Sequence, residues 1–109
     1  MPARTLKRHR PRQRRTRETR RIEALLASAM AGAKVDAYRY NSASIRVRVL
    51  SSSFRNLTRV QREEIVLPLL RRLPDDIYCD ITMLVLLTPA ERRNSMISTE
   101  FDRPTPSLI

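Results

Sequence analysis

Apolar residues recur at helical spacing in two stretches of the chain. In each stretch they follow the i, i+3, i+4 and i+7 pattern that places side chains on one face of a helix. The first stripe consists of Ile22, Leu25, Leu26, Ala29 and Met30, and the second of Val66, Leu69, Leu70 and Leu73. The pattern predicts a helix that begins after Thr16 or Thr19, either of which can cap it, and a second helix that begins after Thr58. Gly32, the only glycine, lies where a left-handed residue can end the first helix.

The second predicted helix has a clear start and an interruption near its end. Thr58 and Gln61 have the spacing of a capping box, in which each side chain accepts a hydrogen bond from the backbone N–H of the other residue. Pro68 lies within the apolar stripe, where it removes one helical N–H and crowds the carbonyl one turn earlier. We therefore expect a kink at Pro68 or a break into two short helices.

Three other stretches are typical of β-strands: residues 34–40, 45–50 and 77–87. The link between the first two, residues 41–44, reads Asn-Ser-Ala-Ser, which is typical of a turn and predicts an antiparallel hairpin. The third stretch is apolar on both faces near its end, as expected for a buried strand.

The predicted elements follow the order α-β-β-α(α)-β-α. Residues 88–91 (Thr-Pro-Ala-Glu) form a further capping box and predict a short helix to about Met96, followed by an extended tail over 97–109. This order predicts an α+β fold, a small three-stranded mixed sheet with helices packed on one face. Arg46 and Arg48 alternate with apolar residues in the second strand, so they would lie on the open face of that sheet.

The charge of the chain is concentrated near its N-terminus. The chain contains 22 Lys and Arg against 11 Asp and Glu, a net charge of +11. Residues 1–21 hold ten basic side chains against Glu18 alone, a net +9, which leaves +2 for the remainder. We therefore predict a disordered basic arm over residues 1–15, a folded domain over 16–96 and the tail over 97–109.

An arginine-rich arm binds polyanions because each phosphate that it neutralises releases condensed counterions. Arginine outnumbers lysine nine to one in residues 1–21, which favours bidentate contacts with phosphate. We predict a non-enzymatic nucleic-acid-binding or ribosome-associated accessory protein, with RNA and DNA both open as partners. The predicted contacts are Arg12, Arg14, Arg15, Arg17, Arg20 and Arg21, with Arg46 and Arg48 as secondary contacts. The alternatives are a solubilising tail without a fixed partner and, for the two strand arginines, an ordinary solvated surface.

Residues suited to catalysis or metal binding are few. Cys79 is the only cysteine, which excludes an intramolecular disulfide, and we predict that it is a small buried residue of the third strand. His9, the only histidine, lies in the arm, so the domain contains no histidine-assisted nucleophile. Glu63 and Glu64 are adjacent and do not face each other on a helix. The sequence therefore predicts no enzyme, no metal site and no cofactor.

The apolar runs predict no membrane-spanning segment. The longest unbroken run, residues 83–87, is far shorter than a bilayer requires. The N-terminal region lacks the apolar core of a secretory signal. We predict a cytoplasmic location, with an organellar transit peptide, which is also rich in arginine and poor in acids, as the alternative.

The central stretch resembles the BolA-like family, whose fold is related to the type II KH domain. Phe54, Asn56, Arg62, Val66 and Leu70 fall at the intervals of the family, and Thr88, Pro89 and Glu91 match its helix start. The resemblance covers roughly residues 22–95 and implies the same fold. It also implies an adaptor that contacts a glutaredoxin-like partner through the central helix and the last strand, with Arg62, Glu63 and Asp80 as partner-binding residues.

The chain departs from this family at the residues that carry its metal role. The family uses two histidines in iron–sulfur partnership with monothiol glutaredoxins, and this chain has Glu63 at the first position and Tyr78 or Asp80 at the second. Imidazole suits iron better than a lone carboxylate does. With a single glycine, the chain also lacks the GXXG loop by which KH modules clamp a nucleic-acid backbone.

Overall fold

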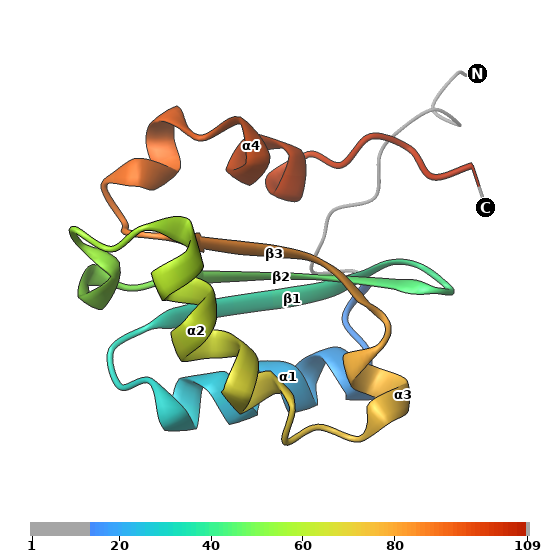
Figure 1. Ribbon diagram of the computed structural model, residues 1–109. Helices are drawn as coiled ribbons and strands as arrows, with labels where there is room; N and C mark the ends of the chain where they lie inside the picture. Colours follow the sequence, from blue (N-terminus) through green and yellow to red (C-terminus); the bar gives the residue numbers. More distant parts are fainter. Residues whose placement is uncertain (1–13, 109) are drawn as a thin grey trace.

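The computed structural model describes residues 14–108, which form one sheet with helices on both of its faces (Figure 1). In chain order the elements are α1 (Arg17–Ala29), β1 (Lys34–Asn41), β2 (Ser44–Leu50), the 3-10 helix η3 (Ser52–Phe54), α2 (Arg59–Leu70), α3 (Asp75–Tyr78), β3 (Ile81–Leu87), the 3-10 helix η4 (Glu91–Asn94) and α4 (Met96–Asp102). The α+β class and the order predicted from the sequence are confirmed. None of the described helices is long and apolar enough to cross a membrane.

The three strands form one mixed sheet in the order β1-β2-β3. β1 and β2 form the predicted antiparallel hairpin, and β2 and β3 are parallel because α2 and α3 lie in the connection between them. The register places Tyr38 opposite Arg46 across the hairpin, and Arg48 opposite Val85 across the parallel pair.

The main core lies between the sheet and the two longest helices, α1 and α2. Its fully buried members include two residues of each predicted helical stripe and one face of the central strand, whereas Ala29 of the first stripe is exposed. The fully buried members are Ile22, Leu26, Ile45, Val47, Val49, Phe54, Val66 and Leu70. Complete burial of a side chain of this size stabilises the fold by about 1.5–3 kcal/mol. The sequence pattern thus located the main core correctly.

Side-chain caps begin α1 and α2 where the sequence predicts them. The Thr16 hydroxyl accepts from the Thr19 N–H at 3.3 Å, and the Thr19 hydroxyl accepts from the Thr16 N–H at 2.8 Å. Thr58 and Gln61 form the same reciprocal box at the start of α2. The break into two helices expected at Pro68 does not occur: α2 continues to Leu70 and loses only the N–H that proline lacks.

The first helix ends as predicted, but the third strand begins later than predicted. Gly32 has φ +81°, in the left-handed region predicted for the end of α1. The strand predicted over 77–87 begins only at Ile81, because Asp75–Tyr78 forms α3. Pro74 precedes this short helix, and two carboxylates in its first turn complement the positive end of the helix dipole.

The face of the sheet that was predicted to be open is covered by α4. The Thr88–Glu91 box forms as predicted, but it opens only η4 rather than a helix to Met96. α4 then occupies the first part of the predicted extended tail. Its Phe101 is 1% exposed and packs edge-on against the Tyr38 ring, with ring centroids 4.8 Å apart.

Candidate nucleic-acid interface

The exposed side of α1 carries Arg17, Arg20 and Arg21, named here the α1 arginine row. Their i, i+3 and i+4 spacing makes them neighbours on the helix surface. Within residues 14–108, none of the three forms an ion pair. Five further basic residues precede the row in segment 1–13. This segment, which includes the predicted contact Arg12, lies outside the described residues.

The two carboxylates of α1 do not neutralise this row, because both are bound elsewhere. Glu18 pairs with the guanidinium of Arg39 in β1 at 3.6 Å. Glu23 pairs with Arg15 at 2.9 Å and accepts from the Ala37 N–H, also at 2.9 Å. The acidic residues of α1 therefore attach the helix to its own sheet, and the positive charge of the row remains uncompensated.

Arg15 differs from the other arginines that were predicted as arm contacts. Besides its 2.9 Å pair with Glu23, it lies 3.5 Å from the Asp36 carboxylate of β1. The folded body thus includes Arg15, one residue before the predicted boundary of the arm. Arg14 is half-buried and the exposed Arg15 is paired, so the α1 arginine row holds the predicted arm contacts that are exposed without an ion pair within residues 14–108.

The α1 arginine row does not stabilise its own helix. It lies in the N-terminal half of α1, where the partial positive charge of the helix end disfavours cations. Arg17 and Arg21 are also like charges at i and i+4, an arrangement that destabilises a helix by about 0.2–0.5 kcal/mol. Folding alone therefore gives no reason for three arginines at these positions.

Arg46 and Arg48 lie on the second sheet face, as predicted, but this face is not open. Arg46 pairs with Glu100 of α4 at 2.9 Å, and Arg48 pairs with Asp102 of α4 at 2.9 Å. Arg48 is only 3% exposed, and its Nη1–H also donates to the Ser98 hydroxyl at 3.0 Å. In this conformation neither guanidinium is accessible to a phosphate, so the expectation of an open face was wrong.

The ion pairs under α4 lower the pKa values of its two acids. Burial opposes the ionisation of Glu100, but the hydrogen bonds from Arg46 and Thr105 and the charge of Arg46 together hold the pKa of Glu100 below its usual range. Burial likewise opposes the ionisation of Asp102, and the hydrogen bonds and charges of Arg48 and Arg92 together lower the pKa of Asp102. Both carboxylates are charged at neutral pH, and α4 presents two anions to the arginines of the sheet.

Arg62, predicted to contact a partner protein, is an internal residue that is 8% exposed. Its guanidinium donates to the carbonyls of Leu57 at 3.1 Å and Leu86 at 2.9 Å, and to the two Glu91 oxygens at 2.7 and 3.0 Å. The hydrogen bonds from Arg62 to Glu91, with one from the Thr88 N–H, lower the pKa of Glu91 to about 2. Arg62 thus joins α2 to the end of β3 and to the turn that follows it.

The other two predicted partner contacts are paired with arginines of the same chain. Glu63 pairs with Arg59 at 3.3 Å on the surface of α2, and Asp80 pairs with Arg39 at 3.0 Å beside β1. The side chains of Arg62, Glu63 and Asp80 are thus each engaged with a different partner within the fold. Contact with a glutaredoxin-like protein stays a prediction.

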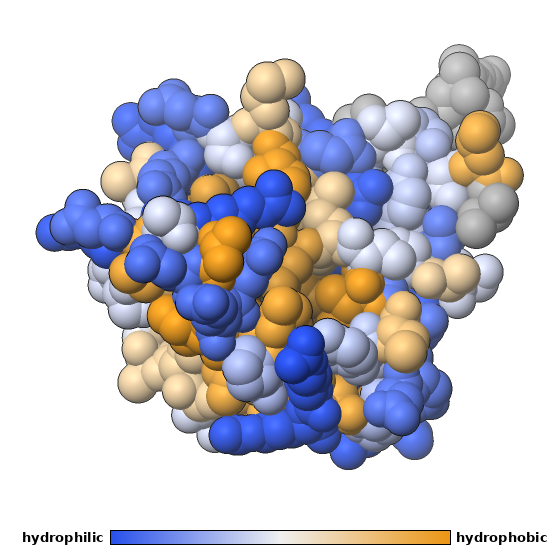
Figure 2. Space-filling model, in the orientation of Figure 1, coloured by the Kyte–Doolittle hydropathy of each residue, from blue (hydrophilic) through white to orange (hydrophobic). Residues whose placement is uncertain are grey.

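Shallow cavities lie along the side of the molecule between α2 and β3. One, of 380 Å³, is lined by Glu63, Tyr78, Cys79 and apolar residues of β3, and another, of 290 Å³, by residues that include Arg59 and Ile97. Figure 2 shows hydrophobic residues reaching the surface between hydrophilic ones on this side. Residues 14–108 contain no group of three or more His, Cys, Asp or Glu that could hold a metal.

The structure also gives Cys79 a different environment from the predicted one. It follows the last residue of α3 and is exposed, rather than buried in the third strand. The prediction failed because a short helix replaced the start of that strand and turned the thiol outward.

Sequence reasoning did not identify the residues by which α4 binds the sheet, which are Ser98, Glu100, Phe101 and Asp102. The sequence does contain a signal for the start of α4, because Ser95 caps this helix by accepting from the Ser98 N–H at 3.1 Å. A serine before an apolar pair is a recognisable cap. The burial of Phe101 had no local trace, since its partner Tyr38 lies 63 residues earlier.

Comparison with known proteins adds no relative to this picture: the chain matches no protein-family model, no curated protein and no solved structure.

Proposed function

We propose that this protein binds nucleic acid through its phosphate backbone, using the α1 arginine row and the basic segment that precedes it. The observation that carries the proposal is the uncompensated row itself: Arg17, Arg20 and Arg21 are exposed without an ion pair among the described residues, while Glu18 and Glu23 are bound elsewhere. A polyanion supplies the missing negative charge.

The chemistry of such binding follows from its residues. Guanidinium groups form bidentate hydrogen bonds with phosphate oxygens, and each neutralised phosphate releases counterions into solution. The contacts position a backbone and read no base edge, so RNA and DNA both fit and sequence has little effect. Affinity depends steeply on salt, since the logarithm of the binding constant falls by about 0.9 per duplex phosphate for each unit of log salt concentration.

A salt titration of matched variants tests the proposal. The first variant combines Arg17→Gln, Arg20→Gln and Arg21→Gln, because glutamine keeps the helix propensity and removes only the charge. The control combines Arg55→Gln, Arg71→Gln and Arg72→Gln, three exposed arginines that also lack an ion pair within residues 14–108. Both variants lower the net charge by the same amount.

The measurement is fluorescence anisotropy of a labelled 20-base-pair duplex and of a labelled 20-nucleotide single strand between 50 and 300 mM NaCl. For the first variant, we expect the slope for duplex to decrease in magnitude by about 2.7, three contacts at about 0.9 each. The control should lose little of its slope. Equal losses in the two variants would show that net charge alone drives the binding and would reject the α1 arginine row as its site.

Removal of residues 1–13 measures how much of the binding affinity comes from the basic segment that precedes the α1 arginine row. Five of the chain's basic residues lie there, so we expect the larger part of the affinity at 50 mM NaCl to be lost with it. The deletion ends before Arg15, because the ion pairs of Arg15 with Glu23 and Asp36 belong to the folded body. Unchanged affinity in this variant would leave no role for the segment.

A further inference from the structure

The sheet face beneath α4 combines tyrosine rings with guanidinium groups. Tyr38 and Tyr40 of β1 lie next to Arg46 and Arg48 of β2, because these residues share one face of the hairpin. The Arg46 guanidinium lies 3.6 Å from the centre of the Tyr40 ring. Rings and guanidinium planes side by side are suited to stacking unpaired bases and to pairing with phosphates.

The residues of α4 that meet this face are an acid, an aromatic ring and a second acid, in consecutive positions. Glu100 pairs with Arg46, and Asp102 pairs with Arg48, both at 2.9 Å. Between them, the Phe101 ring packs edge-on against Tyr38 and lies 4.5 Å from the Arg48 guanidinium. Along a single strand, negatively charged phosphates likewise alternate with aromatic bases. The two carboxylates of α4 therefore correspond to phosphates, and the phenylalanine ring between them corresponds to a base.

α4 leaves one donor of this face unused. Arg48 is 3% exposed, and its Nε–H has no hydrogen-bond partner among residues 14–108, although its other nitrogens bind Asp102, Ser98 and Asp36. A phosphate oxygen can accept from the Nε–H of a guanidinium, which forms one of the two-donor edges that bidentate contacts use. The side chains of α4 therefore satisfy Arg48 less completely than a phosphate could.

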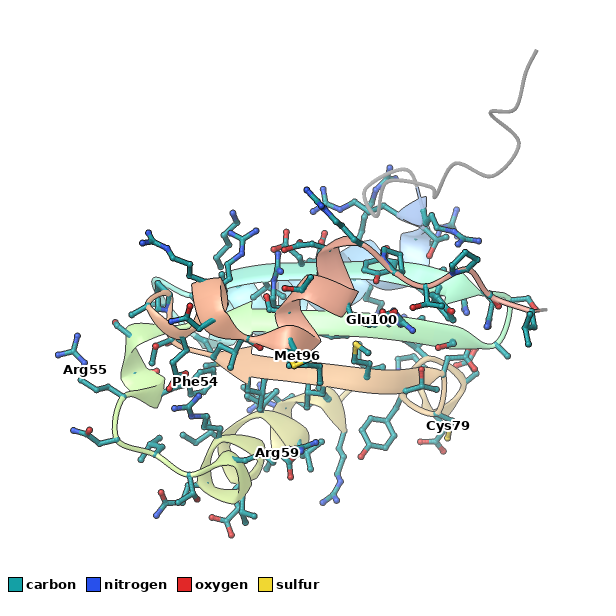
Figure 3. The ribbon with its side chains drawn as sticks, turned by 90° about the horizontal axis from the view of Figure 1, so that it is seen from above. Phe54, Arg55, Arg59, Cys79, Met96 and Glu100 are labelled. Atoms are coloured by element: carbon teal, nitrogen blue, oxygen red, sulfur yellow. The ribbon has the colours of Figure 1, made fainter. Side chains whose placement is uncertain are left out.

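α4 is also attached by few buried groups. It has seven residues, of which only Ser98 and Phe101 are buried, whereas Met96 is 88% exposed and Ile97 is 39% exposed. Figure 3 shows the helix lying across the sheet, with Glu100 over the strands and Met96 near its start. The Phe101 ring, the hydrogen bonds from the Tyr38 hydroxyl to the Phe101 carbonyl and from Arg48 to Ser98, and a set of ion pairs hold α4 on the sheet, and phosphates compete for the same arginines.

We propose that the face formed by Tyr38, Tyr40, Arg46 and Arg48 is a second binding surface, for single-stranded nucleic acid, and that α4 occludes it. Glu100 and Asp102 occupy the places of two phosphates, and Phe101 occupies the place of a base. Displacement of α4 exposes the face. This surface is separate from the α1 arginine row and goes beyond the proposed function, because it distinguishes single strands from duplexes: only unpaired bases can stack on the tyrosines.

The test weakens α4 in the full-length protein and compares two probes. The variant Glu100→Gln with Asp102→Asn removes both anions of α4. The control, Asp75→Asn with Asp76→Asn, removes two exposed carboxylates of α3 and changes the net charge equally. The probes are a labelled 20-nucleotide oligothymidylate and a labelled 20-base-pair duplex, at 300 mM NaCl, where binding through counterion release alone is weakened.

We expect the α4 variant to bind the single strand about tenfold more tightly than the wild type, a change of about 1.4 kcal/mol, with less than a twofold change for the duplex. The control should change less than twofold for both probes. Adding Tyr40→Ala to the α4 variant should abolish the gain, because this ring is one of the stacking platforms.

Two results would overturn the proposal. An equal gain for single strand and duplex would show only the loss of two negative charges. No gain in the α4 variant or in Phe101→Ala, which removes the buried ring without a change in charge, would show that the face does not bind single strands. Far-UV circular dichroism checks that each variant is folded. If the double variant does not fold, Glu100→Gln alone, with the Asp102–Arg48 pair retained, gives the same comparison of probes.

Discussion

Replacement of Arg62 with methionine separates a structural role of this residue from a role in partner binding. Arg62 is 8% exposed and donates to two main-chain carbonyls and to both oxygens of Glu91. Methionine retains an unbranched apolar stem of similar length but donates no hydrogen bond. The variant therefore removes the guanidinium donor from the Leu57 and Leu86 carbonyls and leaves the Glu91 carboxylate with the Thr88 N–H in place of the ion pair.

The size of the effect follows from the burial of the two partners. Removal of one member of a buried ion pair costs about 3–5 kcal/mol, because the other charge is left uncompensated. The Glu91 side chain is 43% exposed, so water replaces part of what Arg62 supplied. We therefore expect the lower end, a loss of about 3 kcal/mol in the free energy of unfolding, which is a large fraction of the 5–15 kcal/mol typical of a domain.

Urea denaturation followed by far-UV circular dichroism measures this loss. With an m-value of about 1.5 kcal/mol/M for a chain of this size, the midpoint should fall by about 2 M. The matched control is Arg59→Met, the same change on the same helix at a side chain that is 81% exposed. Its unfolding free energy should change by less than about 0.5 kcal/mol. If Arg62→Met costs less than about 1 kcal/mol, or no more than the control, the structural role assigned to Arg62 is refuted.

Three further predictions concern acid stability, the core and the thiol. The pKa of Glu91 is about 2 in the folded protein against an ordinary value of 4.5, so its contribution to stability is present above pH 4.5 and is lost as the pH falls towards 2. Glu91→Gln should therefore reduce the difference between urea midpoints at pH 7 and pH 3, and an unchanged difference would contradict the assignment. Leu26→Ala, at a fully buried position, should lower the unfolding free energy by about 2–5 kcal/mol in the same assay, and a loss below 1 kcal/mol would place Leu26 outside the core. Cys79 should react with Ellman's reagent in the absence of denaturant because it is exposed, and protection of the thiol until unfolding would contradict its position after α3.

The arginines differ in whether a carboxylate of the same chain pairs with them, and this difference bears on the proposed functions. Those of the α1 arginine row are exposed and unpaired among the described residues, and Arg15 and Arg39 use the acids of α1 to attach that helix to β1. Arg46, Arg48 and Arg62 are held by carboxylates of the C-terminal third of the chain. Net charge and composition do not distinguish these groups, because the distinction lies in which carboxylate each guanidinium reaches.

The sequence alone predicted the elements whose causes are local. The Thr58–Gln61 box and the apolar stripes of α1 and α2 depend on residues within one or two helical turns, and both survive in the structure. The hairpin of β1 and β2 follows from a short polar link between two alternating stretches. These features needed no knowledge of distant residues.

Only the tertiary structure decided what covers the second face of the sheet. The Tyr38 hydroxyl donates to the Phe101 carbonyl 63 residues away, and Arg46 reaches Glu100 across 54 residues. Arginines on one face of a strand are solvated unless carboxylates from a distant segment pack over them and form ion pairs. The spacing of residues along the strand does not show whether such a segment packs there. Local pattern sets which residues share a face, whereas long-range packing sets which of them are buried and which are paired.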